Sequence, residues 1–265
     1  MSSLFTTLKN GRKIPTIGFG CYAITGTEAV DVFTKAAKCG YRQFDCASMY
    51  KNEKEVGTAI LSVMKSDGIP RSEFFYTTKA WTSEQGTQLS SNIDKAIERC
   101  GLGYIDLMLL HWPSPDKKVR EDSWKALAEA VKDGKLKQAG VSNYNKSQIE
   151  EIYALKTGID PVINQIEINP WVQDAKTIQY CHGENIVLQA YGPLARASNL
   201  DDPTLKQVAE EVSKTPAQVL VRWSIQKGYV PLPKSSNEER MRKNLDVEGF
   251  ELSKANIESL DSLAR

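Results

Sequence analysis

The sequence predicts an α/β protein that folds as a (β/α)8 TIM barrel, with an N-terminal β-hairpin and an additional C-terminal helix. The chain of 265 residues contains eight units in which a short apolar run is followed by an amphipathic helical pattern. No linker, low-complexity segment or change of composition separates these units. Because right-handed crossovers make successive strands parallel, the eight units predict a barrel. We therefore expect residues 1–265 to form a single domain.

The first element is a hairpin that precedes the repeating units. Residues 5–8 and 13–16 flank the pair Asn10-Gly11, which is typical of a tight type I′ turn between two strands. The hairpin is not part of a strand–helix unit, so we expect it to be an addition that plugs the bottom of the barrel.

The repeating units follow, and each expected helix carries an apolar stripe, such as Val56, Ile60 and Val63. The expected strands are short apolar runs, as in a parallel sheet buried on both faces. They cover residues 17–20, 41–46, 74–79, 105–111, 136–141, 162–167, 186–191 and 229–233. The expected helices cover 27–38 (capped by Thr27 and stopped by Gly40), 53–65, 88–100, 121–133, 146–156, 174–182, 203–227 (broken near Pro216), 237–245 and the added 254–263.

A second α/β architecture has to be weighed against the barrel. The segment Gly18-Phe19-Gly20-Cys21-Tyr22-Ala23 matches G-x-G-x-x-A after a strand, and Asp45 follows about twenty residues later, as in a Rossmann fingerprint. However, the next helix begins only near Thr27, too late for the glycines to present its N-terminus to a pyrophosphate. No composition shift marks a second domain either, so the barrel is favoured.

Composition excludes several classes of function. The 34 basic and 33 acidic residues give a net charge of +1, so there is no overall attraction to nucleic acid or acidic membranes. No apolar run is long enough to span a bilayer, and the N-terminus lacks a signal-peptide pattern. The 5 cysteines have no framework spacing, which indicates reduced thiols in a cytoplasmic protein. With 2 histidines and no CxxC pair, no metal site is expected.

Reactive side chains follow several of the expected strands. Asp45, Lys79 and His111 each stand at a strand end, and Tyr50 lies in the loop after Asp45. In a barrel, the carboxyl ends of the strands converge on one mouth, so these side chains should meet. A tyrosine titrates near 10 in water, and a lysine beside it favours the phenolate and lowers that pKa. Asp45 would hold Lys79 charged, which makes the group an acid–base centre rather than a core ion pair and a buried imidazole.

These residues belong to motifs through which nearly the whole chain resembles the aldo-keto reductase superfamily. The motifs are Gly40-Tyr41-Arg42-Gln43-Phe44-Asp45-Cys46-Ala47, Tyr50-Lys51-Asn52-Glu53, Thr78-Lys79, Asp106-Leu107-Met108-Leu109-Leu110-His111-Trp112-Pro113, Gly140-Val141-Ser142-Asn143-Tyr144 and Pro233-Lys234-Ser235-Ser236 with Arg240 and Asn244. The resemblance implies NADPH-dependent reduction of aldehydes and ketones. Tyr50 would protonate the carbonyl oxygen as hydride arrives from the nicotinamide, and His111 would donate a hydrogen bond to that oxygen or help to relay a proton.

The resemblance also implies a set of cofactor-binding residues. Ser142, Asn143 and Gln165 match the family positions that hydrogen-bond the carboxamide, and Tyr191 matches the aromatic residue on which the nicotinamide ring stacks. Leu194 belongs to the loop that passes near the pyrophosphate. Lys234, Ser235 and Arg240 match the residues around the 2′-phosphate, and Asn244 matches the residue that contacts the adenine. Two cations and a hydroxyl suit a phosphate dianion, which Arg can bind in a bidentate manner. A helix opening near Asn237 would add its N-terminal dipole.

Tyr22, Trp81 and Trp112 match positions that line the family's substrate pocket, which suggests an apolar cleft, although three aromatics could also simply pack the loops. The sequence departs from many relatives in having no tail beyond Arg265, short loops after Trp112 and Leu194, and Lys243 where an acidic adenine contact is frequent. We therefore expect an open mouth with broad specificity that includes bulky keto esters or diketones.

Two interpretations of function follow. The first is a monomeric, cytoplasmic NADPH-dependent carbonyl reductase that acts on small molecules. The alternative is a regulatory or structural protein of aldo-keto type that binds the cofactor but works through a protein partner. The complete set of Asp45, Tyr50, Lys79 and His111 favours the enzyme.

Overall fold

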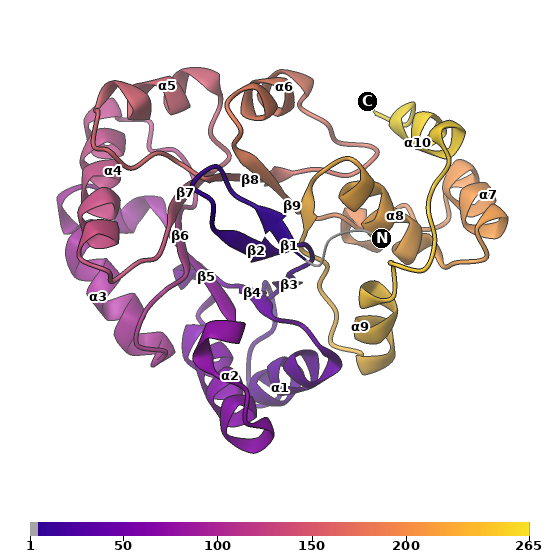
Figure 1. The fold of residues 1–265 in the computed structure, drawn as a ribbon, viewed down its shortest axis with the longest axis horizontal. Coiled ribbons are helices and arrows are strands. Elements are labelled where there is room, and N and C mark those ends of the chain that lie inside the picture. Colours follow the sequence, from indigo (N-terminus) through magenta and orange to yellow (C-terminus); the bar gives the residue numbers. More distant parts are fainter. Residues whose placement is uncertain (1–4, 265) are drawn as a thin grey trace.

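The computed structural model describes residues 5–264 and contains an eight-stranded parallel sheet curled into a barrel (Figure 1). Each strand pairs with the next one along the chain, which confirms the predicted topology. The strands are β3 (Phe19–Gly20), β4 (Gln43–Asp45), β5 (Phe75–Ala80), β6 (Leu107–Leu110), β7 (Ala139–Ser142), β8 (Ile163–Glu167), β9 (Val187–Tyr191) and β10 (Val230–Pro231). Several of them begin later than expected, including β4, β6 and β7.

The barrel closes where the first strand meets the last. The Gly18 amide donates to the Pro231 carbonyl and the Gly20 amide to the Pro233 carbonyl, both at 3.0 Å. A Cβ atom on Gly20 would lie 2.9 Å from the Leu232 carbonyl oxygen, so a side chain there would push the two segments apart. The glycines of the G-x-G pattern therefore permit close approach at the closure, which excludes the Rossmann interpretation.

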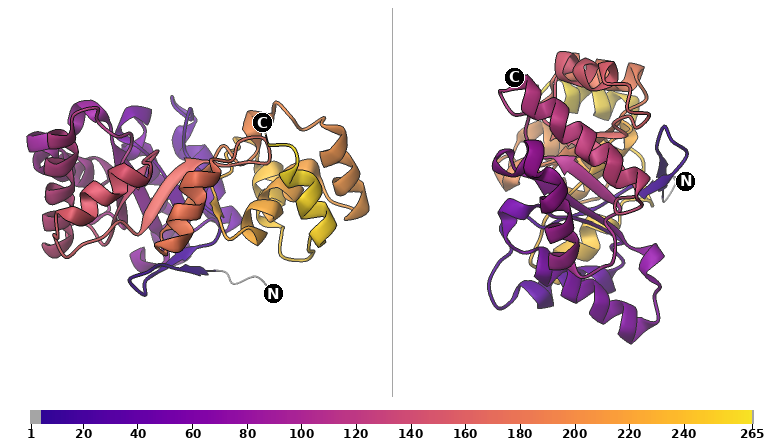
Figure 2. Two further views of the ribbon diagram at one scale, coloured as in Figure 1. Left: turned by 90° about the horizontal axis from the view of Figure 1, so that it is seen from above. Right: turned by 90° about the vertical axis from the view of Figure 1, so that its left-hand side faces the viewer.

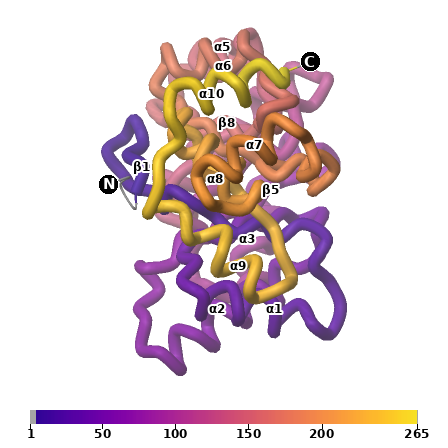
Figure 3. Tube along the Cα trace, turned by 90° about the vertical axis from the view of Figure 1, so that its right-hand side faces the viewer, coloured from indigo at the N-terminus to yellow at the C-terminus, as the bar shows by residue number. Residues whose placement is uncertain are grey.

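Helices surround the sheet, and Figure 2 shows them on its outside in two further views. They are α1 (Ala29–Cys39), α2 (Glu53–Asp67), α3 (Leu89–Cys100), α4 (Lys117–Lys132), α5 (Lys146–Ala154), α6 (Ala175–Gly183), α7 (Pro203–Glu211), α8 (Pro216–Gln226), α9 (Glu238–Leu245) and α10 (Lys254–Asp261). The predicted C-terminal addition, α10, packs beside α7 (Figure 3), where the Asn256 amide donates to Glu211 at 2.7 Å. Within residues 5–264, no helix combines the length and apolarity needed to cross a bilayer.

Two helix boundaries correct the sequence-based expectations. Thr27 does not cap α1, because a turn from Gly26 to Ala29 precedes the helix and Glu28 occupies the cap position. Helix α4 begins at Lys117 rather than residue 121, because the Asp116 side chain caps it by accepting from the Lys118 amide. The break expected near Pro216 is confirmed, because residues 203–227 form two helices and the second begins at Pro216 with a capping box at Thr215.

The hairpin is confirmed, but its expected turn type is wrong. Strands β1 (Phe5–Thr7) and β2 (Lys13–Pro15) pair antiparallel. The Gly11 amide donates to the Leu8 carbonyl at 2.8 Å, and Gly11 has φ 81°. Asn10 is not among the residues with positive φ, whereas a type I′ turn requires positive φ at both central positions.

The hairpin closes the bottom of the barrel, as expected. Its buried Leu8 and Ile14 pack in one apolar cluster with residues from the amino-terminal part of the strands, such as Phe75, Leu107 and Ile163. Figure 2 shows the hairpin on one side of the sheet. The candidate site lies at the opposite rim of the barrel, which is formed by the carboxyl ends of the strands.

Candidate active site

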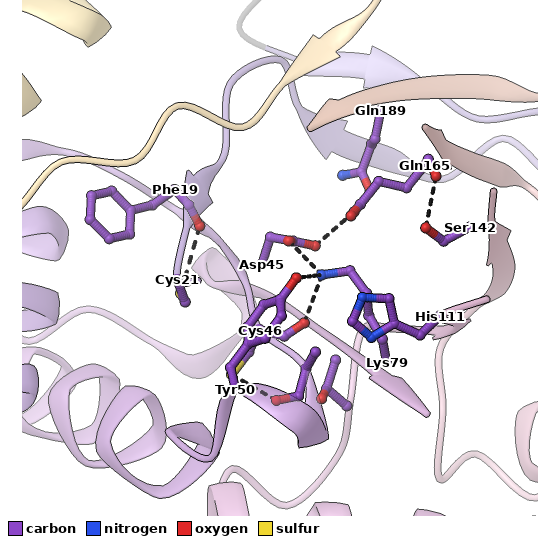
Figure 4. Close-up of polar contacts among 12 residues, drawn as sticks. Phe19, Cys21, Asp45, Cys46, Tyr50, Lys79, His111, Ser142, Gln165 and Gln189 are labelled. Carbon is purple, nitrogen blue, oxygen red and sulfur yellow. Dashed lines mark hydrogen bonds and ion pairs between the residues drawn. The ribbon is translucent and has the colours of Figure 1, made fainter. Parts of the chain in front are cut away.

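The centre of the candidate site is Lys79, which is fully buried near the carboxyl end of β5. Its Nζ atom donates to Asp45 Oδ2 at 2.6 Å, to the Cys46 carbonyl at 2.9 Å and to the Tyr50 hydroxyl at 3.2 Å (Figure 4). Asp45 ends β4, and Tyr50 ends the single helical turn Ser48–Tyr50 that follows. The structure therefore brings together three residues that lie on two neighbouring strands and the loop between them.

Burial and the neighbouring charges shift the pKa values of Lys79 and Tyr50 in opposite directions. Burial alone would lower the pKa of Lys79, but Asp45 and Tyr50 outweigh it and the net direction is upward, so the ammonium stays charged. For Tyr50, burial dominates over the opposing effect of Lys79 and raises the pKa to about 12. The expectation of a net lowering was wrong, because the sequence does not show how deeply the phenol is buried. Tyr50 is consequently protonated at neutral pH.

His111 follows β6 and stands next to the phenol. Its ring lies 5.7 Å from the Tyr50 ring and 5.0 Å from the Trp81 ring, centroid to centroid, and both contacts are edge-on. Burial, and then the charge on Lys79, lower the pKa of His111 to about 3, so the imidazole is neutral. Its Nδ1 atom is buried and has no hydrogen-bond partner among residues 5–264.

The second oxygen of Asp45 is held by a glutamine from the far side of the barrel. Gln165 Nε2 donates to Asp45 Oδ1 at 2.7 Å and to Gln189 Oε1 at 3.0 Å (Figure 4). The family resemblance assigns Gln165 to the cofactor and gives no role to Gln189. Gln189 could have been found from the alternation of side chains along β9, because residues two apart on a strand lie on the same face and Gln189 therefore shares the face of Tyr191.

The other residues assigned to the carboxamide and the nicotinamide ring form a continuous network. Ser142 Oγ donates to the Gln165 carbonyl at 2.8 Å, and Asn143 Nδ2 donates to Ser142 Oγ at 3.0 Å. The Tyr191 hydroxyl donates to Asn143 Oδ1 at 3.1 Å. These side chains come from the carboxyl ends of β7, β8 and β9, next to the lysine centre.

Leu194, assigned to the pyrophosphate loop, is partly buried against the core just after β9. The loop around it is unusual in its backbone, because Ala195, Arg196 and Ala197 all have positive φ, at 46°, 51° and 64°. Non-glycine residues adopt this region only at an energetic cost, and such residues cluster at ligand-binding segments.

The residues assigned to the phosphate lie at the start of α9. Ser235 is buried, and Arg240 Nε contacts its hydroxyl at 3.5 Å. Lys234 and Arg240 are exposed and have no salt bridge within the described part of the chain. Asn237 caps α9 by accepting from the Arg240 amide at 2.9 Å.

Other cations of α9 differ from Arg240 in being paired. Arg242 and Lys243 form i,i+4 salt bridges with Glu238 and Glu239, at 2.8 and 2.7 Å. Asn244, assigned to the adenine, is buried on the same helix. Lys243, the position where the sequence departs from many relatives, is thus paired with Glu239 on the surface.

The aromatic residues assigned to the substrate surround this mouth. Tyr22 is 63% exposed, and its ring lies edge-on to the Tyr50 ring at 5.2 Å. Trp112 is 48% exposed, and Trp81 is half-buried. The two tryptophans line an open cleft of about 770 Å³ with the 113–115 loop and the first turns of α4 and α5. Tyr50 and His111 do not line this cleft, so it lies beside the lysine centre and shares the wall that Trp81 forms.

The fold and this site define a (β/α)8-barrel protein with a buried acid–base centre at the carboxyl ends of its strands. A profile described as "Aldo/keto reductase family" matches residues 16–265. The chain therefore belongs to the aldo/keto reductase family, as the sequence resemblance implied.

Individual relatives agree with this membership. The chain is 40% identical over 267 residues to a glyoxal reductase of Bacillus subtilis, covering 99% of this chain and 94% of that protein. It is 42% identical to an uncharacterized oxidoreductase of Saccharomyces cerevisiae, covering 97% and 93% of the two chains. The crystal structure of an aldo/keto reductase from Brucella melitensis superimposes with a TM-score of 0.92 at 35% identity, over 98% of both chains.

Proposed function

We propose that this protein is a single-domain, NADPH-dependent reductase that converts aldehydes and ketones to alcohols. The observation that carries the proposal is the buried Lys79 ammonium, which contacts both a carboxylate and a phenol at the barrel mouth. A purely structural ion pair would not need the phenol, and a hydroxyl held beside a cation is suited to donating a proton.

The cofactor residues fit a phosphorylated dinucleotide. Arg240 contacts the Ser235 hydroxyl, and neither it nor the neighbouring Lys234 forms a salt bridge within the described residues, whereas Arg242 and Lys243 on the same helix are paired. A phosphate dianion would supply the missing counter-charge. Ser142, Asn143, Gln165 and Tyr191 would hold the nicotinamide end, Leu194 would lie near the pyrophosphate, and Asn244 would contact the adenine. When bound, the reduced nicotinamide supplies a hydride.

The protein's own residues would carry out the proton transfer. Tyr50, protonated because burial raises its pKa to about 12, donates its hydroxyl proton to the carbonyl oxygen of the substrate. Lys79, 3.2 Å from the hydroxyl oxygen, stabilises the phenolate that this transfer leaves. Asp45 keeps the ammonium in place, and the neutral imidazole of His111 donates a ring N–H to the same carbonyl oxygen.

The substrate is proposed to lie between Tyr22, Trp81 and Trp112. Because the tryptophan cleft is open, apolar contacts select only weakly among carbonyl compounds, and bulky keto esters or diketones should be accepted. The glyoxal reductase relative makes small dicarbonyl compounds a reasonable first choice.

The test is a panel of dicarbonyls, keto esters and simple aldehydes assayed with NADPH and with NADH. We expect oxidation of NADPH by several members and a marked preference for NADPH. Absence of turnover with every carbonyl would overturn the proposed reaction and favour a non-catalytic member of the family. Equal efficiency with NADH would overturn only the choice of cofactor.

A further inference from the structure

Asn52 occupies the N-cap position of α2, yet its side chain does not cap the helix. Asparagine is favoured at this position because its side-chain oxygen accepts from the amides of the first turn. Asn145 and Asn237, the N-cap residues of α5 and α9, make that contact with the Gln148 and Arg240 amides. The Asn52 side chain is fully buried, so its polar groups must be used elsewhere.

The Asn52 amide joins two segments that are separate in the sequence. Its Nδ2 atom donates to the carbonyls of Cys21, at 2.9 Å, and Ile24, at 2.8 Å. Its Oδ1 atom accepts from the Cys46 thiol at 3.0 Å. The Cys46 carbonyl is also one of the three acceptors of Lys79. Asn52 therefore connects the loop after β3, the end of β4 and the turn that carries Tyr50, two residues earlier.

The segment held by the two amide donations is strained. Between Cys21 and Ile24 lies Ala23, an exposed residue with φ 55°, a backbone region that residues with a side chain adopt only at an energetic cost. The same segment carries Tyr22, whose ring lies edge-on to the Tyr50 ring at 5.2 Å. Without the two hydrogen bonds, the turn would lose two of the contacts that offset its strain, and Tyr22 would be held less firmly over the phenol.

We propose that Asn52 is a positioning residue for the proton donor: it holds the Cys21–Ile24 turn so that Tyr22 packs on Tyr50 in a productive geometry. This inference rests on the proposed carbonyl reduction, and it adds a residue that touches neither the substrate nor the cofactor. The amide is suited to this role because two carbonyl oxygens require two N–H donors, while the thiol requires an acceptor.

The experiment compares variants at two positions. Asn52→Ala removes the amide. Ala23→Val leaves Asn52 in place but disfavours the left-handed backbone through an exposed β-branched side chain, and Ala23→Gly is its matched control, because glycine adopts this region freely. Asn256→Ala removes a buried amide from α10, far from the barrel mouth. For each variant, kcat and KM for a carbonyl substrate, the Kd for NADPH and the Tm are measured.

We expect Asn52→Ala to lower kcat/KM about tenfold or more, with a nearly unchanged Kd for NADPH. Ala23→Val should change the same parameters in the same direction, even if Asn52→Ala does not fold, and Ala23→Gly should not. Asn256→Ala should lower the Tm alone.

If wild-type protein turns over carbonyls and Ala23→Val matches Ala23→Gly in kcat/KM, the inference is overturned while the proposed function stands. It is equally overturned if folded Asn52→Ala retains wild-type kcat/KM. A wild type without turnover would overturn the proposed function and this inference together.

Discussion

Lys79 Nζ lies 2.6 Å from Asp45 Oδ2 at a point where the lysine side chain is fully buried and the aspartate side chain is 5% exposed. Two charges removed from water are tolerated only when they are paired and further hydrogen-bonded. Here the ammonium has two more acceptors, and the second carboxylate oxygen accepts from Gln165. The pair is thus part of a satisfied network rather than an isolated ion pair.

Removing one partner of this pair should be costly. Lys79→Met leaves a buried carboxylate without its counter-ion, and such losses typically amount to about 3–5 kcal/mol of unfolding free energy. Urea unfolding of both proteins measures the effect. Lys135→Met provides the matched control, because Lys135 pairs with Asp94 at 2.7 Å on the surface and its loss should change little. Equal effects of the two substitutions would contradict the role assigned to burial.

Tyr50→Phe should abolish most carbonyl reduction while NADPH still binds, because it removes the proposed proton donor and leaves the proposed cofactor residues intact. General acid catalysis contributes about 10²–10⁴-fold, so the loss of kcat should be of that order or larger. The control is Tyr76→Phe, because the Tyr76 hydroxyl is buried with no hydrogen-bond partner in residues 5–264. Near-normal turnover by Tyr50→Phe would rule out this proton donor.

His111 should make the protein sensitive to acid. Its pKa falls from 6.5 to about 3 on folding, so at pH values between these two the unfolded chain binds a proton that the folded protein does not. Stability should therefore fall as the pH drops through this window, by about 1.4 kcal/mol per pH unit for one proton. His111→Gln should lack this component in urea unfolding from pH 7 to pH 4. His182→Gln, at the exposed second histidine, should retain it. Parallel stability–pH curves for wild type and His111→Gln would refute the assignment.

The fold and the meeting of the acid–base residues could be predicted because both depend on topology. Once eight parallel strands are accepted, the carboxyl ends of β4, β5 and β6 must lie side by side, and Asp45, Lys79 and His111 must face one mouth. The hairpin plug followed from the same reasoning, because the hairpin belongs to no strand–helix unit.

Features that depend on burial or on distant partners were not predictable in the same way. Burial raises the pKa of Tyr50 and Lys79 lowers it. The sequence predicts the proximity of Lys79 but not the depth to which the phenol is buried. Asn52 stands where a helix opens, so its sequence context indicates a cap, whereas its partners lie up to 31 residues away. Gln165 reaches Asp45 across 120 residues, and no local pattern encodes that contact.

Arg240→Ala should weaken NADPH binding about tenfold or more and change NADH binding much less, because the proposed charge-assisted hydrogen bond to the extra phosphate would be lost. Arg242→Ala is the matched control on the same helix, since that guanidinium is already paired with Glu238. Kd values for both cofactors can be measured by fluorescence titration. A uniform loss for NADPH and NADH would show that Arg240 supports the helix rather than the phosphate.

Trp112→Ala should alter the ranking of substrates at the barrel mouth. The side chain is 48% exposed and lines the open cleft beside the lysine centre, so it can contact the outer part of a bulky substrate without touching the reacting carbonyl. An apolar contact of this kind contributes about 1–3 kcal/mol to discrimination, which corresponds to a change in relative kcat/KM of roughly ten- to two-hundredfold. Keto esters of increasing size should therefore lose more efficiency than small aldehydes, and the Kd for NADPH should stay nearly constant.

Leu61→Ala is the control, because Leu61 is 41% exposed on α2 and does not line the cleft. An unaltered ranking in Trp112→Ala would mean that Trp112 only packs the loop, since a residue that contacts the bulky group must affect large and small substrates differently.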